Sequence, residues 1–309
     1  MESLSVKEFT SDVMKRWWNL MRKLRVWLPY AAMATIIIAV QVSALFLATP
    51  FEVQNVKAFE NPESAINPLI FVLFIFAFTA FVLVLVRFKA ALIHFIILAA
   101  VAFTLLYVFE AFFPLMPALL LAGAFTLVLY KYPEWYVVNF VGLLISAGAA
   151  AIFGISLAIL PTMILLVVLA IYDFLAVYKT KHMVALAESM VSMKVPVLFV
   201  VPRSLKYSLL RQNGLHEEAH IMGLGDAVIP TILVVSANVF LNADRLFGFV
   251  SLPALFTMLG TLLGYFALIL LASKKKAHAG LPFLNSGAIF GFFVGCLMSG
   301  VPLSTLLSL

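Results

Sequence analysis

Two aspartates stand inside segments that are otherwise apolar enough to cross a membrane. Asp173 lies near the end of the apolar run 156–178, and Asp226 lies near the start of the run 221–241. A carboxylate at bilayer depth costs about 2.5–3.5 kcal/mol or more, so each of them needs a functional reason. Two close carboxylates in a low dielectric cannot both ionise, and they therefore share one proton. One can then activate a water while the other hydrogen-bonds a carbonyl oxygen, which is the chemistry of an aspartic protease.

The two aspartates are expected at the same depth in the membrane. Asp173 lies five residues before Tyr178, where its span reaches the cytoplasmic side. Asp226 lies five residues after Ile221, where the next span leaves that side. At about 1.5 Å per residue, both carboxylates lie about 7–8 Å below the same surface. No lysine or arginine lies at that depth in either span to neutralise them. Neighbouring helices that run in opposite directions can therefore turn the two carboxylates toward each other.

Paired acids also occur in proton and cation pathways, and depth alone favours a transporter or channel as much as a protease. The residues around Asp226 favour the protease. Gly223 and Gly225 precede it in the string Gly-Leu-Gly-Asp, and their missing side chains let another backbone approach closely. Tyr172 directly precedes Asp173. Its hydroxyl can bond a polar partner in the site, or its ring can pack near the membrane interface.

The elements that must position these residues are transmembrane helices. The chain has 309 residues, of which 64% are hydrophobic and 11% are charged, whereas a soluble domain has about 45–50% apolar and about 25% charged residues. This composition excludes a soluble enzyme, a disordered protein and a coiled coil. At about 20 apolar residues for each span, the sequence predicts an all-α membrane protein, a polytopic bundle of nine transmembrane helices. The expected spans are 28–48, 67–86, 90–109, 114–130, 136–154, 156–178, 221–241, 249–272 and 281–305.

Basic residues set the expected orientation of these spans. All lysines and arginines except Lys57 and Arg245 lie in the amino-terminal tail or in alternate connections, and such residues favour the cytoplasmic side. The amino terminus is therefore expected in the cytoplasm and the carboxyl terminus outside. The expected divisions are a cytoplasmic basic tail at 1–27, helices one to six at 28–178, a cytoplasmic loop at 179–220, and helices seven to nine at 221–309.

The connection at 179–220 is longer than the other connections between spans. It contains an extended apolar piece at 195–202, which is bounded by prolines. Two interpretations stay open. The connection can be a membrane-surface helix followed by a buried linker. Alternatively, residues 195–202 can form a strand edge that accepts an unwound peptide through main-chain hydrogen bonds.

Two short motifs resemble those of a known family. Tyr172-Asp173 in one span and Gly223-Leu224-Gly225-Asp226 in the next are similar to the YD and GxGD motifs of the presenilin and signal peptide peptidase family. The resemblance implies nine spans, catalytic aspartates on spans six and seven, and hydrolysis of peptide bonds within transmembrane segments of other proteins. It makes Asp173 and Asp226 the expected catalytic pair. The residues that it implies as shaping the site are Tyr172, Gly223, Leu224 and Gly225.

The third motif of that family, Pro-Ala-Leu, has two candidate positions here. The literal string occurs at 253–255, at the outer start of span eight. In the family the motif begins span nine, beside the catalytic pair, and the matching position here is Pro282-Phe283-Leu284. The resemblance therefore assigns substrate binding to Pro282, Phe283 and Leu284, with phenylalanine in place of alanine. A proline-stiffened, non-helical stretch is expected there, whose free backbone groups hold the substrate.

The resemblance also implies partners. The orientation and the short loop are similar to those of a microbial, archaeal presenilin homologue, which is expected to act without accessory subunits and leaves homo-oligomerisation open. The expected partners are transmembrane protein or peptide substrates and the lipid bilayer. The net charge of +6 stands in short basic clusters that suit anionic headgroups, so no nucleic-acid partner is expected. No cofactor and no metal are expected either.

A zinc site is the weaker alternative. Residues 216–220 match H-E-x-x-H, which on a helix places His216 and His220 on one face to bind zinc, with Glu217 as general base. The string follows Asn213 in a polar loop, has no obvious third ligand, and leaves the intramembrane Asp173 unexplained. Aspartic chemistry is therefore expected over zinc chemistry.

Overall fold

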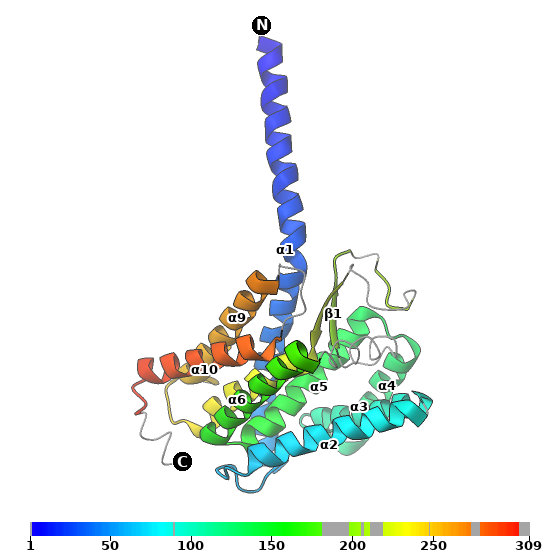
Figure 1. The fold of residues 1–309 in the computed structure, drawn as a ribbon, viewed down its shortest axis with the longest axis vertical. Helices are drawn as coiled ribbons and strands as arrows, with labels where there is room; N and C mark the ends of the chain where they lie inside the picture. The colour runs from blue at the N-terminus through cyan, green and yellow to red at the C-terminus, as the bar shows by residue number, and fades with distance from the viewer. Residues whose placement is uncertain are drawn as a thin grey trace.

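Long apolar helices make up most of the molecule. The computed structural model describes residues 2–88, 90–180, 198–204, 207–210, 219–246, 248–272 and 279–302. Each of the nine predicted spans overlaps one long helix within these ranges (Figure 1). The long helices are α1 (Glu2–Val53), α2 (Asn67–Phe88), α3 (Ala90–Glu110), α4 (Leu115–Lys131), α5 (Trp135–Ser156), α6 (Ile159–Leu175), α8 (Leu224–Phe240), α9 (Leu252–Ala272) and α10 (Leu281–Met298).

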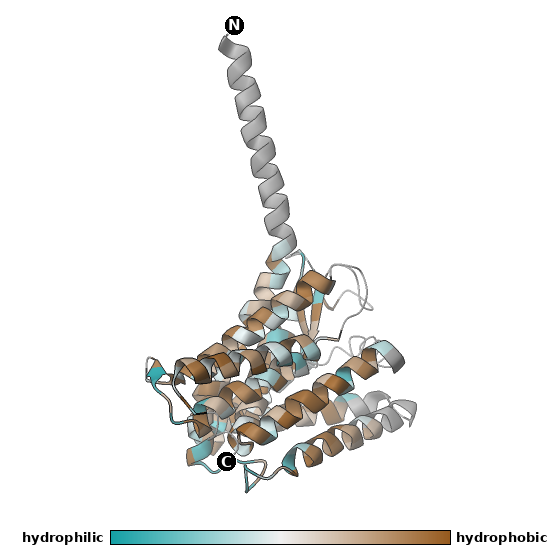
Figure 2. Cartoon of the chain, turned by 60° about the vertical axis from the view of Figure 1, so that its left-hand side comes forward, coloured by the Kyte–Doolittle hydropathy of each residue, from teal (hydrophilic) through white to brown (hydrophobic). Residues whose placement is uncertain are grey.

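Among the described residues, five helical stretches are long and apolar enough to cross a membrane by length and composition: Trp27–Val53, Trp135–Ser156, Ile159–Tyr178, Leu252–Leu271 and Leu281–Met298. The apolar stretches Asn67–Phe81, His94–Glu110, Leu115–Lys131 and Leu224–Phe240 are shorter. Figure 2 shows hydrophobic residues along the helices and hydrophilic residues mainly in the connections. Large apolar side chains such as Phe74, Leu120 and Leu297 are exposed on the helices, as expected for surfaces that face lipid.

Several boundaries differ from the sequence expectation. The first helix begins at Glu2 and continues through the predicted tail into the first span. Span six ends in a short π-helix, η1 (Ala176–Thr180). Span seven begins at Leu224 rather than at 221, because the residues before it form a strand. The close pair of spans five and six is separated by Leu157 and Ala158, whose extended backbone ends α5 before α6 begins.

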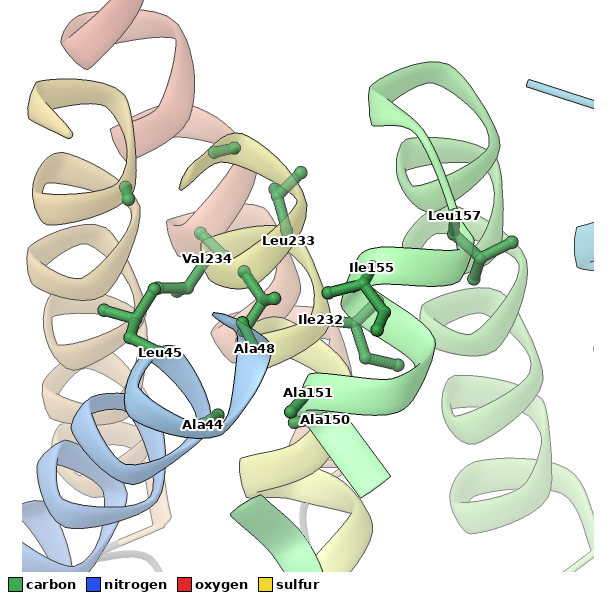
Figure 3. Close-up of a cluster of buried hydrophobic side chains, with 14 of the residues drawn as sticks. Ala44, Leu45, Ala48, Ala150, Ala151, Ile155, Leu157, Ile232, Leu233 and Val234 are labelled. Carbon is green, nitrogen blue, oxygen red and sulfur yellow. The ribbon is translucent and has the colours of Figure 1, made fainter. Parts of the chain in front are cut away.

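A core of small and branched side chains joins α1, α5 and α8 (Figure 3). Ala44 and Ala48 of α1 lie in the same buried cluster as Ala150 and Ala151 of α5. Small residues let helix backbones approach closely inside a membrane, where contact between helices relies on packing rather than on the exclusion of water. Further along α5, a Cβ added at Gly154 would overlap the side chain of Val235 in α8.

Helices α9 and α10 touch along their backbones. A Cβ added at Gly260 would overlap the carbonyl oxygen of Gly287, and one added at Gly264 would overlap that of Phe283. Gly291 likewise lies against the carbonyl of Phe256. Glycines spaced four apart on both helices therefore make this a small-residue contact. It fixes the start of α10 relative to α9.

Two small antiparallel sheets lie at opposite ends of α8. Strand β1 (Leu198–Pro202) pairs with β2 (Ala219–Gly223), and β2 leads directly into the start of α8. Beyond the other end of α8, β3 (Arg245–Leu246) pairs with β4 (Val250–Ser251). The Asn238 side chain holds this second sheet, because its Nδ2 donates to the Phe249 oxygen at 3.0 Å and its Oδ1 accepts from the Ser251 nitrogen at 2.7 Å.

The contact between α9 and α10 predicts a stability effect. We expect Gly260→Ala to lower the free energy of unfolding by about 1–3 kcal/mol, because the methyl group must push two backbones apart. Gly123→Ala in α4 is the matched control, since an added Cβ there meets no described atom within 4 Å. Thermal unfolding in detergent measures both variants. Equal melting temperatures for the two would contradict the close contact.

Candidate active site

The two intramembrane aspartates lie at the ends of helices that meet at one end of the bundle. Asp173 lies in the last turn of α6, and its side chain is only 6% exposed. Asp226 lies in the first turn of α8 and is partly buried. A negative charge in the first turn of a helix interacts favourably with the helix dipole. The structure thus places both carboxylates at the same end of the bundle, as the sequence predicts.

Both carboxylates converge on the residues that begin α10. The backbone N–H of Leu281 donates to Oδ2 of Asp173 at 3.1 Å. A Cβ built on the neighbouring Gly280 would lie 3.2 Å from both Cγ and Oδ2 of Asp226. The two carboxylates therefore flank adjacent residues at the start of α10. Because Gly280 has no side chain, the start of α10 can lie close against the Asp226 carboxylate.

The glycines before Asp226 have different surroundings. Gly223 is the last residue of β2 and the cap of α8, and a Cβ there would lie 3.5 Å from Oδ2 of Asp226. Gly225 is exposed, and an added Cβ meets no atom of the described chain within 4 Å. Leu224 packs inward, where its Cδ2 lies 3.1 Å from the Cβ position of Gly142 in α5. The open face beside Asp226 is therefore the one that Gly225 presents.

Tyr172 points to a different neighbour from Asp173. Its ring packs edge-to-face against Phe76 of α2, with ring centroids 4.8 Å apart. Consecutive helix residues lie about 100° apart around the axis, because a turn takes 3.6 residues. Asp173 consequently faces α10 while Tyr172 faces α2. This geometry matches the packing role that the sequence left open for the tyrosine.

The segment Pro282-Phe283-Leu284 lies beside the two aspartates, but its conformation differs from the expectation. It is the first turn of α10 rather than a non-helical stretch. The N–H groups of Phe283 and Leu284 both bond to the Gly280 oxygen, at 3.1 and 3.2 Å. Proline suits the first turn of a helix, because its fixed φ fits and its missing N–H would be unpaired there. The free backbone groups expected here are therefore used within the protein.

One side chain of this segment, Leu284, and that of the next residue, Asn285, are also engaged within the protein. Leu284 is fully buried in a cluster that includes Phe199 of β1 and Met222 of β2. One residue further, Nδ2 of Asn285 donates to the Leu166 oxygen of α6 at 2.9 Å, which adds a second link between α10 and α6. Leu284 therefore joins the start of α10 to the buried side chains of the β1–β2 sheet.

The other two sequence motifs lie away from this arrangement or outside the described residues. Pro253 is the second residue of α9 and lies against Gly295, which is near the opposite end of α10 from Leu281. The literal Pro-Ala-Leu string is therefore distant from both aspartates. His216 and Glu217 of the zinc motif lie outside the described residues. His220 lies in strand β2 rather than in a helix, with its ring 4.6 Å from that of Tyr30, and burial together with the charge of Arg203 lowers its pKa.

Gly280 and Leu281 are site residues that the sequence argument missed. The available signal was Gly280 two residues before Pro282, which is the pattern of a helix start. That pattern predicts an unpaired N–H at Leu281 but does not name its acceptor, because Asp173 is 108 residues away in the chain.

Comparison with known proteins agrees with this arrangement of helices. A sequence model of the family described as "Signal-peptide peptidase, presenilin aspartyl protease" matches residues 34–301. The chain belongs to this family. A presenilin family intramembrane aspartate protease, solved in space groups C222 and P2, is similar in structure. The C222 structure is 38% identical in sequence to this chain, with a TM-score of 0.66. The match covers 88% of this chain and 99% of the solved chain. The P2 form has 39% identity, the same coverage and a TM-score of 0.65.

A search of curated proteins found no significant match. Family membership makes this chain a multi-pass membrane protein and a peptide hydrolase of the presenilin type. The all-α class expected from composition is confirmed by its helices and by its structural relatives.

Gly280 and Gly225 predict opposite outcomes for one added methyl group beside Asp226. We expect Gly280→Ala to lower the turnover number for peptide cleavage on the order of 10–100-fold, because the methyl would displace the carboxylate of Asp226. Gly225→Ala should leave the melting temperature unchanged or raised, because its methyl meets open space, and should act on KM instead. Cleavage kinetics and thermal unfolding of the two variants check this. A normal turnover number in Gly280→Ala would contradict the close contact.

Proposed function

We propose that this chain is an intramembrane endopeptidase in which Asp173 and Asp226 act together to hydrolyse peptide bonds within transmembrane segments of its substrates. The observation that carries the proposal is the convergence of both carboxylates on Gly280 and Leu281. Two acids that share one short backbone segment can act on one substrate atom. An acid pair without this convergence would be two separate intramembrane charges.

The proposed reaction uses one proton held between the two acids. The ionised carboxylate takes a proton from a water, whose oxygen attacks the carbonyl carbon of the scissile bond, while the protonated carboxylate donates to the carbonyl oxygen. The resulting tetrahedral diol collapses as its C–N bond breaks: one diol hydroxyl returns its proton to the ionised carboxylate, and the leaving nitrogen takes a proton from the protonated one, so the pair again holds one proton. The starting proton belongs to the coupled pair rather than to either aspartate alone. The N–H of Leu281 holds Asp173 in orientation throughout.

A substrate helix must open before this chemistry, since its carbonyl groups are hydrogen-bonded within the helix. An extended substrate can restore its backbone bonds by adding to a strand edge. The described part of the expected segment 195–202 is indeed strand β1, but one of its edges is paired with β2. At Val200 the other edge bonds to Asn139 of α5. The strand proposed to pair with the substrate is therefore β2 rather than β1. The last residue of β2 is three residues before Asp226.

Partners and orientation remain predictions. The basic connections still predict a cytoplasmic amino terminus, an outside carboxyl terminus, and the divisions at 27, 178 and 220. The family relationship supports transmembrane proteins or peptides as substrates and the bilayer as the site of action. Activity without accessory subunits and the oligomeric state are the points that a purified single chain would test.

Replacing each aspartate predicts the loss of cleavage. We expect Asp173→Asn and Asp226→Asn each to lower cleavage of a labelled single-span substrate by about 10²–10⁴-fold or more, because each removes an acid–base group. A transition-state mimic of aspartic proteases should inhibit the wild type, and a chelator should have no effect. Product formation in detergent measures all of these.

Asp244→Asn is the matched control, because Asp244 is an exposed acid in the connection between α8 and β3. Loss of activity with the chelator alone would favour the zinc motif at His216 and His220. A wild type that makes no peptide product but carries ions into liposomes, in a way that depends on Asp173 or Asp226, would favour a channel or transporter.

A further inference from the structure

One side chain of α5 closes an edge of the β1–β2 sheet. The Nδ2 of Asn139 donates to the Val200 oxygen at 2.8 Å, and the Val200 nitrogen donates to Oδ1 of Asn139 at 2.8 Å. A carboxamide offers one donor group and one acceptor on the same side. Asn139 thus makes the same two bonds that a residue of a neighbouring antiparallel strand would make.

This pairing determines which way the backbone groups of the sheet face. In an antiparallel ladder, alternate residues direct their N–H and C=O groups to opposite edges. Since the polar groups of Val200 face α5, those of Phe199 and Val201 face β2. Ile221 lies opposite Val200 in the register, so its N–H and C=O point away from β1. In the part of the chain that the structure describes, neither group has a hydrogen-bond partner.

Helix α5 holds the same sheet at further points. The Glu134 carboxylate accepts from Oγ of Ser208 at 2.6 Å and from the Leu209 nitrogen at 3.0 Å, beyond the end of β1. One turn after Asn139, the missing side chain of Gly142 makes room for the Phe199 ring, 3.4 Å from its Cβ position, and for Leu224. Helix α5 therefore acts as a rigid template for β1 and for the residue two positions before Asp226.

We propose that Asn139 is a specificity-determining positioning residue, which directs an extended substrate to the β2 edge and sets its register relative to Asp226. The inference rests on the proposed function. Asn139 holds Val200, Val200 lies opposite Ile221, and Ile221 is joined to Asp226 by four residues of unbroken strand and helix. A substrate strand that pairs with Ile221 is therefore held at a defined distance from Asp226. The peptide bond that reaches the aspartates is set by this register.

We expect a variant with a loosened β1–β2 sheet to cleave its substrate at additional peptide bonds. Leucine has nearly the shape of asparagine and none of its hydrogen bonds, so Asn139→Leu removes the clamp while it keeps the volume. We expect the ratio of the principal product to products cut at neighbouring bonds to fall several-fold, because β1 and β2 can shift in register. Mass spectrometry of the products from a single-span substrate measures that ratio in the full chain.

Asn238→Leu is the matched control. Asn238 also uses its amide as one donor and one acceptor, to the Phe249 oxygen just before β4 and from the Ser251 nitrogen of β4, at the other end of α8. Its loss should lower the melting temperature comparably and leave the product ratio unchanged. An equal change of the ratio in both variants would overturn the inference, because general loosening would then explain it.

A second variant serves if Asn139→Leu does not fold. Asn139→Asp keeps the acceptor for the Val200 nitrogen and loses the donor to the Val200 oxygen, and a broadened product ratio is expected here too. A variant at Asn139 that folds, cuts more slowly and keeps the wild-type ratio overturns the inference alone. A wild-type chain that cuts nothing overturns the proposed function and this inference with it.

Discussion

The hydrogen bond from the Leu281 N–H to Asp173 is the interaction on which the arrangement of the site depends. The first N–H groups of any helix have no partner within that helix, and in a membrane each unpaired group costs several kcal/mol. At the start of α10, Pro282 has no N–H, and the carboxylate of a different helix caps that of Leu281. The same bond brings Gly280 against Asp226. One requirement for backbone pairing thus holds three helix ends together at the two acids.

The close contact of α9 with α10 keeps this segment in place. Gly264 lets the carbonyl of Phe283 approach the α9 backbone, and Gly260 does the same for Gly287. The first turn of α10 is therefore held by α9 on one side and by Asp173 on the other. The N–H groups of Phe283 and Leu284, in the segment that the family motif marks as substrate-binding, are bonded within α10, while the Pro282 and Phe283 side chains are partly exposed. Substrate binding by this segment stays a prediction.

The β1–β2 sheet directly precedes α8 in a molecule that is otherwise mostly helical. Strands leave backbone groups unpaired along their edges, and Asn139 pairs those of Val200 on the outer edge of β1. Among the described residues, the Ile221 backbone groups on the outer edge of β2 have no partner. Strand β2 runs into α8, which carries Asp226, without a connecting loop. A sheet edge that ends three residues before one acid of the pair suits a substrate that must exchange its own helical bonds for new ones before hydrolysis.

Hydropathy along the sequence determined the class of protein and the nine long helices found among the described residues, and it predicted an equal depth for Asp173 and Asp226, because length, apolar composition and rise per residue are local quantities. The Gly-Leu-Gly-Asp string likewise marked the start of α8 to within a few residues. Only the tertiary structure decided that Pro282 begins a helix, that Gly280 and Leu281 meet the aspartates, and that Asn139 closes β1. Two of these features are hydrogen bonds to backbone groups far away in the sequence. Asn139 and Val200 are 61 residues apart, and Asp173 and Leu281 are 108 residues apart. A single sequence shows which polar groups need a partner, and the packing of the helices decides which partner each one finds.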